Sequence, residues 1–150
     1  MNSRSNSSAQ ILGIVIIVLA LIGVGFWWLV STKQAMAKEG REFGKEAIQR
    51  IIVQHDQAFF SSRLGPQARM NFPPSTVQEF FEDLAKFGAP IGPVNVEGDI
   101  QFQSHFFEPT GEFHAHVNYA TRDADITIDI SHPESRWQLD AVSFVPGKER

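Results

Sequence analysis

Three histidines and the carboxylates near them in the C-terminal half are the residues best suited to chemistry. His114 and His116 lie two residues apart in a stretch that alternates apolar and polar residues, so on a β-strand their side chains share one face. Centring the turns between successive strands places His105 on one side of them and Asp129 or Asp125 on the other. Two or three imidazoles with a carboxylate can bind zinc or copper, or can titrate near neutral pH. The candidate metal ligands are therefore His105, His114, His116 and Asp129.

A plainer interpretation is that these residues are solvated polar positions on the exposed face of a sheet. Exposed pairs of histidine and aspartate contribute only about 0–1 kcal/mol each. Asp125 and Asp129 also offer two carboxylates on one face, at a separation of about 7 Å or less, but the sequence places no general acid near them. We favour the solvated interpretation, because spacing alone does not distinguish a metal site from alternating surface charge.

The sequence contains no established catalytic motif. It lacks a glycine-rich phosphate loop, a nucleophile elbow and a His-Glu-x-x-His zinc motif. Because it also has no cysteine, disulfides and thiolate metal sites are excluded. His55 lies on the apolar stripe of a predicted helix, where a core or boundary residue is more usual than a ligand. We therefore predict a protein that is not an enzyme and that uses no cofactor.

The candidate ligands lie in a region whose hydrophobic pattern has a period of two. Four stretches alternate apolar with polar residues, and a further short strand is possible at residues 94–96. The connections are short, so the strands are expected to form an antiparallel meander. The last stretch changes phase at Val142 and Phe144, which predicts a bulge or a strand buried on both faces. The alternating apolar positions are Ile100, Phe102 and Phe106; Phe113, Ala115, Val117 and Tyr119; Ala124, Ile126, Ile128 and Ile130; and Trp137, Leu139 and Ala141.

A long amphipathic helix is predicted to precede the strands, over residues 31–64. Apolar residues recur there at spacings of three and four, and no proline interrupts them. Gly40 and Gly44 are points where this helix could bend. Gly65 and Pro66 are expected to end it.

A second, shorter helix is predicted after the rigid loop at residues 71–74. Ser75 or Thr76 can cap its first turn, and Gly88 supplies a C-terminal stop. The resulting fold class is α+β, with two helices packed on a curved antiparallel sheet of four or five strands. The thirteen phenylalanines suit the layer between helices and sheet.

An uncharged apolar segment near the N-terminus predicts one transmembrane helix. Residues 11–30 contain no charged side chain, and 20 helical residues span a hydrocarbon core of about 30 Å. Residues 1–10 are small and polar, which predicts a disordered tail. The alternative is a cleaved signal peptide, but the apolar run exceeds the usual 7–15 residues and only Arg4 precedes it. The remaining residues, 65–150, complete a single α+β domain after the membrane-proximal helix.

Charge is distributed unevenly along the 150 residues, whose formal net charge is −4. Residues 31–69 contain 7 Lys or Arg against 4 Asp or Glu, whereas the chain from residue 70 onward contains 5 against 13. A basic segment next to the anchor suits anionic lipid headgroups, while an acidic domain is repelled by phosphate backbones. The lipid bilayer is therefore an expected partner, and nucleic acid is not.

The side of the membrane on which the domain lies follows less directly from the sequence. Lysines and arginines after the anchor outnumber those before it, which favours a cytoplasmic domain. Long C-terminal segments, however, translocate largely regardless of charge, and Phe26, Trp27 and Trp28 also fit an outward-facing interface. We expect an extracytoplasmic, periplasmic domain, mainly because of a family resemblance.

That resemblance is to the cytochrome oxidase assembly factor family. It depends on Phe87-Gly88-Ala89-Pro90-Ile91, on Gly98-Asp99-Ile100 and on Trp137-Gln138-Leu139, and it covers about residues 77–145. Members pair one membrane helix with a small extramembrane α+β domain. The added first helix is also similar in layout to membrane-anchored nuclear transport factor 2-like (cystatin-like) domains. Both resemblances imply the same architecture, and neither transfers a catalytic residue.

Together these features predict a non-catalytic, membrane-anchored accessory or assembly subunit of a larger membrane protein complex. Its sheet domain would serve protein–protein contact. The alternative is a membrane-anchored ligand- or metal-binding sensor domain that uses a cone-shaped pocket or the histidine face. The sequence predicts neither the partner complex nor the oligomeric state.

Overall fold

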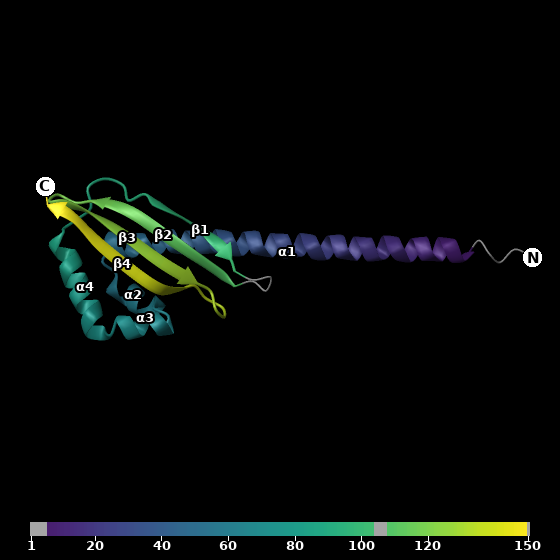
Figure 1. Cartoon of the computed structure of the whole chain (residues 1–150), viewed down its shortest axis with the longest axis horizontal. Helices are drawn as coiled ribbons and strands as arrows, with labels where there is room; N and C mark the ends of the chain where they lie inside the picture. Colours follow the sequence, from purple (N-terminus) through teal and green to yellow (C-terminus); the bar gives the residue numbers. More distant parts are fainter. Residues whose placement is uncertain (1–5, 104–107, 150) are drawn as a thin grey trace, which may run out of the picture. The chain divides into compact units, whose positions relative to one another are not determined.

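A computed structural model describes residues 6–103 and 108–149 of the chain, with side chains from residue 10 onward (Figure 1). In this part of the chain the fold is α+β, with one long apolar N-terminal helix, three short helices and a four-stranded antiparallel sheet. The predicted α+β class, with one long apolar N-terminal helix and a four-stranded antiparallel sheet, is confirmed, whereas the number and bounds of the remaining helices differ from the prediction. The chain divides into two compact units, Met1–Met36 and Ala37–Arg150.

The long helix α1, Asn6–Ile52, belongs to both units. In the first unit, side chains from Ile11 to Trp28 are exposed, and the stretch is long and apolar enough to cross a membrane. A disordered tail was expected over residues 1–10. Residues 6–10 are instead helical and continue directly into this stretch. In the second unit one face of α1 is buried in the core, through Phe43, Ala47, Ile48, Ile51 and Ile52.

The helix predicted over residues 31–64 is interrupted, so the prediction of one continuous helix was wrong in its C-terminal part. α1 ends at Ile52, and α2 begins anew at Gln57–Arg63. Between them His55 adopts a left-handed backbone with φ of 50°. Asp56 then caps α2, because its carboxylate accepts a hydrogen bond from the N–H of Phe59 at 2.9 Å.

Two further helices follow where a loop and one helix were predicted. α3, Pro66–Asn71, is a short helix with proline in its first turn, where the missing N–H has no intrahelical partner to lose. α4, Pro74–Lys86, begins before Ser75 and Thr76, so neither of these residues is its cap. The predicted stop is confirmed, because Gly88 takes φ of 78° just after the helix.

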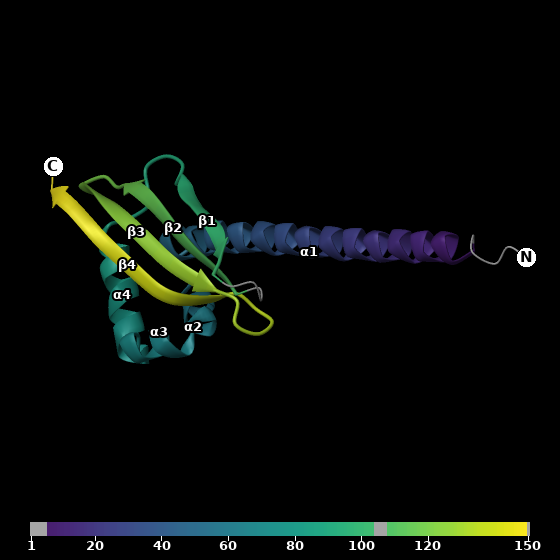
Figure 2. The same ribbon diagram turned by 45° about the vertical axis from the view of Figure 1, so that its right-hand side comes forward.

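The four strands pair in chain order as the predicted meander. They are β1, Val96–Phe102; β2, Pro109–Asn118; β3, Arg122–Ser131; and β4, Gln138–Glu149. Every neighbouring pair is antiparallel. The separate short strand expected at residues 94–96 is not formed: only Val96 is in a strand, as the first residue of β1, so the sheet has four strands in the described chain. Figure 2 shows α2, α3 and α4 on the same side of this sheet, next to β4.

The core lies between the inner face of the sheet and the helices of the second unit. Phe113, Ile126, Ile128 and Leu139 are fully buried, as alternation predicted. α1 is continuous through Gly44, where a Cβ atom would lie 2.6 Å from the ring of Phe113. The glycines of α1 in this unit therefore permit close packing of helix on sheet.

A bulge in β4 confirms the predicted phase shift. Ile130 pairs with Leu139, but Asp129 pairs with Ala141, so Asp140 is the extra residue. Beyond the bulge, Val142 and Phe144 lie opposite Ile128 and Ile126 and so share the inner face of the sheet.

Candidate functional site

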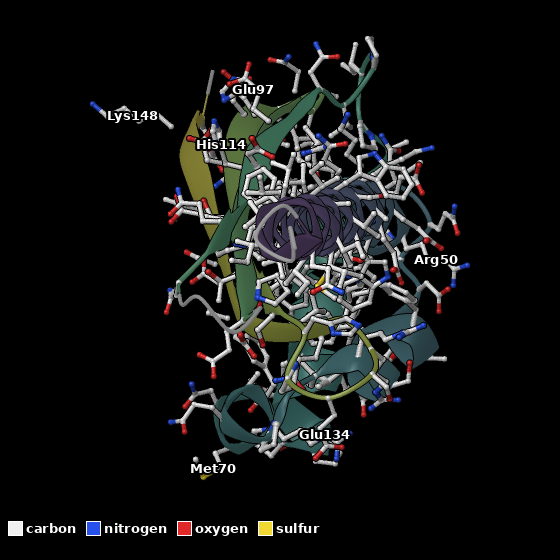
Figure 3. All side chains as sticks on the ribbon, turned by 90° about the vertical axis from the view of Figure 1, so that its right-hand side faces the viewer. Arg50, Met70, Glu97, His114, Glu134 and Lys148 are labelled. Carbon is white, nitrogen blue, oxygen red and sulfur yellow. The ribbon has the colours of Figure 1, made fainter. Side chains whose placement is uncertain are left out.

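The outer face of the sheet holds the histidines that the sequence singled out. His114 lies 3.3 Å from Glu97 of β1, and Figure 3 shows these two side chains together at the sheet surface. The Nδ1 atom of His116 lies 2.7 Å from Asp125 across the β2–β3 pair, and its Nε2 atom lies 3.7 Å from Asp123. Both histidine side chains are more than half exposed. His105 lies outside the described residues.

Asp129 belongs to a different part of this outer face. It pairs across the strands with Glu112, while His116 pairs with Asp125. Partial burial raises the pKa of Asp129, and the negative charges of Glu112 and Asp140 raise it further. In the described part of the chain no set of three His, Asp or Glu side chains converges as metal ligands would.

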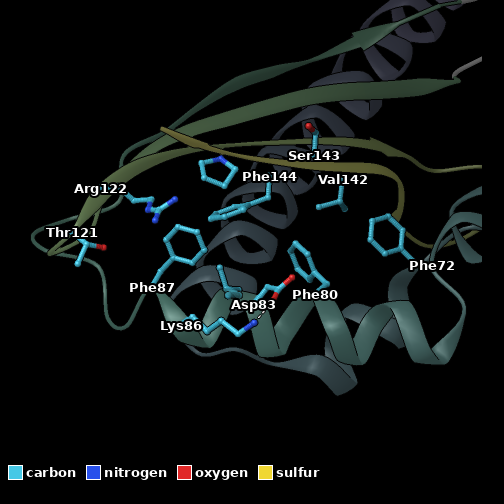
Figure 4. A pocket seen from close by; sticks show the side chains of 12 residues that line it. Phe72, Phe80, Asp83, Lys86, Phe87, Thr121, Arg122, Val142, Ser143 and Phe144 are labelled. Carbon is cyan, nitrogen blue, oxygen red and sulfur yellow. Dashed lines mark hydrogen bonds and ion pairs between the residues drawn. The ribbon is translucent and has the colours of Figure 1, made fainter. Parts of the chain in front are cut away.

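A hollow lined by aromatic and aliphatic side chains together with charged ones lies between α4 and the second half of β4 (Figure 4). Its volume is about 690 Å³, within the usual range of roughly 300–1,000 Å³ for ligand pockets. We call this hollow the α4–β4 groove. Its lining includes Phe72, Phe80, Leu84, Phe87, Val142, Ser143 and Phe144.

Aromatic side chains from α4, from its flanks and from β4 form the walls of the α4–β4 groove. Phe144 meets Phe87 edge-on at 5.3 Å between ring centroids and meets Phe80 at 6.3 Å. Phe72, Phe80, Phe87 and Phe144 are each half-buried, unlike the fully enclosed phenylalanines of the core. The groove therefore presents partly uncovered aromatic surface, which is the usual character of a binding site.

Charged residues stand around the α4–β4 groove in pairs. Lys86 lies 2.6 Å from Asp83, and this ion pair raises the pKa of Lys86. Arg122 pairs with Glu149, and its guanidinium lies 5.5 Å from the centre of the Phe87 ring. Because each of these cations has an anionic partner, the groove carries little net charge.

Tyr119 lies next to the α4–β4 groove and supports one of its walls. Its ring is 5.3 Å from Phe87, and its side chain is almost completely buried. Burial raises the pKa of Tyr119 to about 12. The Tyr119 hydroxyl has no hydrogen-bond partner within the described residues.

Sequence reasoning did not identify the α4–β4 groove as a site. By helical spacing, Phe80 and Phe87 fall on the same apolar face as Phe81 and Leu84, which are core residues. The phase shift at Val142 and Phe144 was the available signal, because the bulge brings these two residues to the inner face of β4, where they line the groove.

Comparison with family models, with curated proteins and with solved structures finds no match for this chain. The function is therefore argued from its own residues.

Proposed function

We propose that this chain is a non-catalytic accessory subunit of a larger membrane protein complex, anchored by residues 11–30. The observation that carries the proposal is the exposure of that apolar stretch, in which Leu21 is 67% exposed and Trp27 is 71% exposed. Contiguous apolar surface of this extent is rare on soluble proteins. It suits the hydrocarbon core of a bilayer, which takes about 20 helical residues to cross.

The α4–β4 groove supports a role in protein contact. Its phenylalanines are only half-buried, and aromatic residues are enriched where proteins bind one another. The charges at its rim are paired, as in the pair of Lys86 and Asp83, so the groove suits binding rather than proton transfer.

The experiment for this proposal is gentle detergent extraction of the full chain, followed by native gels and mass spectrometry of the bands. We expect co-migration with a complex much larger than the 16.8 kDa chain. Phe144→Asp, inside the α4–β4 groove, should weaken that association. The matched control is Val145→Asp, one residue along on the exposed outer face. Migration of the parent protein on its own would contradict the proposal.

We also propose that the domain lies on the extracytoplasmic side of the membrane. The test uses the absence of native cysteine, which makes a single introduced thiol unambiguous. Ser135→Cys, in the exposed loop before β4, should react with a membrane-impermeant maleimide in intact cells. The cysteine-free parent is the control for background labelling. Labelling only after the cells are permeabilised would place the domain in the cytoplasm.

The volume of the α4–β4 groove supports a second candidate function, a membrane-anchored domain that binds a small apolar ligand. Saturating palmitate, a long apolar probe, should then raise the melting temperature of the parent but not that of Phe144→Asp. An unchanged melting temperature in the parent would count against this alternative.

A further inference from the structure

The two edges of the sheet differ in how they are protected from pairing with other chains. β1, at one edge, carries Glu97 and Asp99. Charges of this kind discourage the addition of another strand. β4, at the other edge, has 12 residues and is the longest strand of the sheet.

Protection of β4 is confined to its two ends. At its start, the C=O of Leu139 accepts a hydrogen bond from the N–H of Gly65 at 2.8 Å, and Leu64 forms an isolated bridge with Leu139. Towards its end come Pro146, which has no N–H, and Lys148. Between them residues 141–145 are uncharged, and no other described segment forms a backbone hydrogen bond with their outer edge.

The open stretch of β4 borders the α4–β4 groove. Val142 and Phe144 point into the groove from the inner face, as Figure 4 shows. Ser143 lies between them on the opposite face of the strand, yet it also lines the groove. The groove therefore reaches the strand edge itself, and α4 forms its far wall.

We infer that the α4–β4 groove binds an extended segment of a partner protein, which adds to β4 as a fifth strand. Open backbone donors and acceptors recognise another extended backbone rather than a helix or a lipid chain. The half-buried Phe80, Phe87 and Phe144 would receive apolar side chains at every second position of the segment. Five open residues correspond to about 17 Å of extended chain. The inference rests on the proposed function, because it takes the partner to be a protein.

The test uses the full chain in lipid nanodiscs and a synthetic peptide of about seven residues that alternates threonine with isoleucine, phenylalanine and valine. Two N-methylated versions of this peptide are used. In each, methyl groups replace the amide hydrogens along one edge of the extended peptide, and the blocked edge differs between the two versions. We expect one version to lose at least tenfold in affinity and the other to bind like the parent peptide. Hydrogen exchange should also slow at backbone amides of residues 141–145 when the peptide is bound.

Matched variants separate groove binding from general surface binding. Phe144→Ser and Phe87→Ser should each lower peptide affinity at least tenfold, with circular dichroism confirming that the domain is folded. Val53→Ser, at an exposed position between α1 and α2, should leave the affinity unchanged.

Three results would overturn the inference. One is no change in hydrogen exchange at millimolar peptide, and another is equal behaviour of the two N-methylated peptides. The third is hydrogen exchange in β4 that becomes slower as the protein concentration rises, with no peptide present. That result would assign the edge to a second copy of this chain. Since none of these assays involves the native complex, such a failure leaves the co-migration result for the accessory role standing.

Discussion

At the scale of single residues, the histidine face behaves as exposed surface. Glu97 pairs with His114, while Asp123 and Asp125 pair with His116, and these pairs are largely solvated. We expect replacement of His105, His114 and His116 together by Gln to change the free energy of unfolding by about 1 kcal/mol or less, because exposed ion pairs are weak. Chemical denaturation of parent and variant measures the difference.

The same variant tests metal binding. A metal that binds only the native state at a hundredfold excess over Kd would add about 2.7 kcal/mol. We expect zinc and copper to leave the melting temperature of the parent unchanged. A rise of several degrees that disappears in the triple variant would instead favour the metal-binding hypothesis.

Asp129 gives a pH-dependent prediction. Its pKa is raised above the ordinary value of 3.8, so the charged form is disfavoured in the folded protein. The resulting loss of stability is absent at acidic pH, where the carboxyl group is protonated in both states, and appears as pH rises through the two pKa values. Asp129→Asn should therefore raise the melting temperature at pH 7 and have little effect near pH 3. An equal gain at both pH values would show that charge is not the cause.

Single residues also show which part of the histidine face could be predicted from the sequence and which part could not. The shared face of His114 and His116 follows from strand alternation alone, and the structure has it. Which carboxylate stands opposite them depends on the register of β2 against β3, which brings Asp125 to His116 and Asp129 to Glu112. A register is fixed by packing across the whole pair of strands, so centring the turns could not distinguish these two aspartates.

At the scale of elements, Trp137 joins the start of β4 to the helix layer. It is 3% exposed and packs beside Phe43 of α1, with 6.4 Å between ring centroids. We expect Trp137→Ala to lower the free energy of unfolding by about 3–5 kcal/mol, because it leaves a large cavity in a packed interior. Denaturant unfolding of the full chain measures the loss, with exposed Val145→Ala as control. A loss below about 1 kcal/mol would contradict the packing described above.

Gly44 gives a second prediction about the contact of α1 with the sheet. An alanine there gains up to about 1 kcal/mol of helix propensity, but its Cβ atom would clash with the fully buried ring of Phe113. Overpacking costs about 1–3 kcal/mol, so Gly44→Ala should lower the melting temperature of the domain. Gly25→Ala is the control, because nothing lies within 4 Å of a Cβ atom there. A melting temperature that rises in Gly44→Ala would mean that Phe113 can move aside.

Local sequence patterns predicted the elements well where one periodicity persisted. The four strands and the bulge in β4 follow from alternation and from its phase shift. The break in the predicted helix at residues 53–56 was missed, because the apolar spacing of three and four residues continues through His55 to Phe59. Asp56 was a usable signal, since aspartate is a favoured N-cap residue.

At the scale of the whole molecule, the exposed apolar stretch is long and apolar enough to be a candidate membrane span. Arginine at the centre of a membrane helix costs about 3 kcal/mol of insertion free energy. Val18→Arg should therefore move the protein out of the membrane fraction, or lead to its degradation, as membrane fractionation with immunoblotting would show. Val18→Leu is the control. Unchanged fractionation of Val18→Arg would contradict a spanning helix.

Prediction of the α4–β4 groove needed the whole molecule as well. Phe80 and Phe81 are neighbours on α4, yet Phe81 is in the core and Phe80 is half-buried in the groove. Phe80 lies in the groove because Phe144, which the bulge brings to the inner face of β4, stands opposite it. No property of the α4 sequence alone contains that information.

The contact between Phe43 and Trp137 also has a consequence during translation. About a hundred residues separate the two partners, so a ribosome adding roughly 5–20 residues per second makes the helix several seconds before the tryptophan that covers it. Until Trp137 and β4 are made, the sheet lacks its fourth strand and Phe43 lacks the ring that packs beside it. A nascent chain stalled before Trp137 should accordingly be degraded by proteases that leave the finished protein intact.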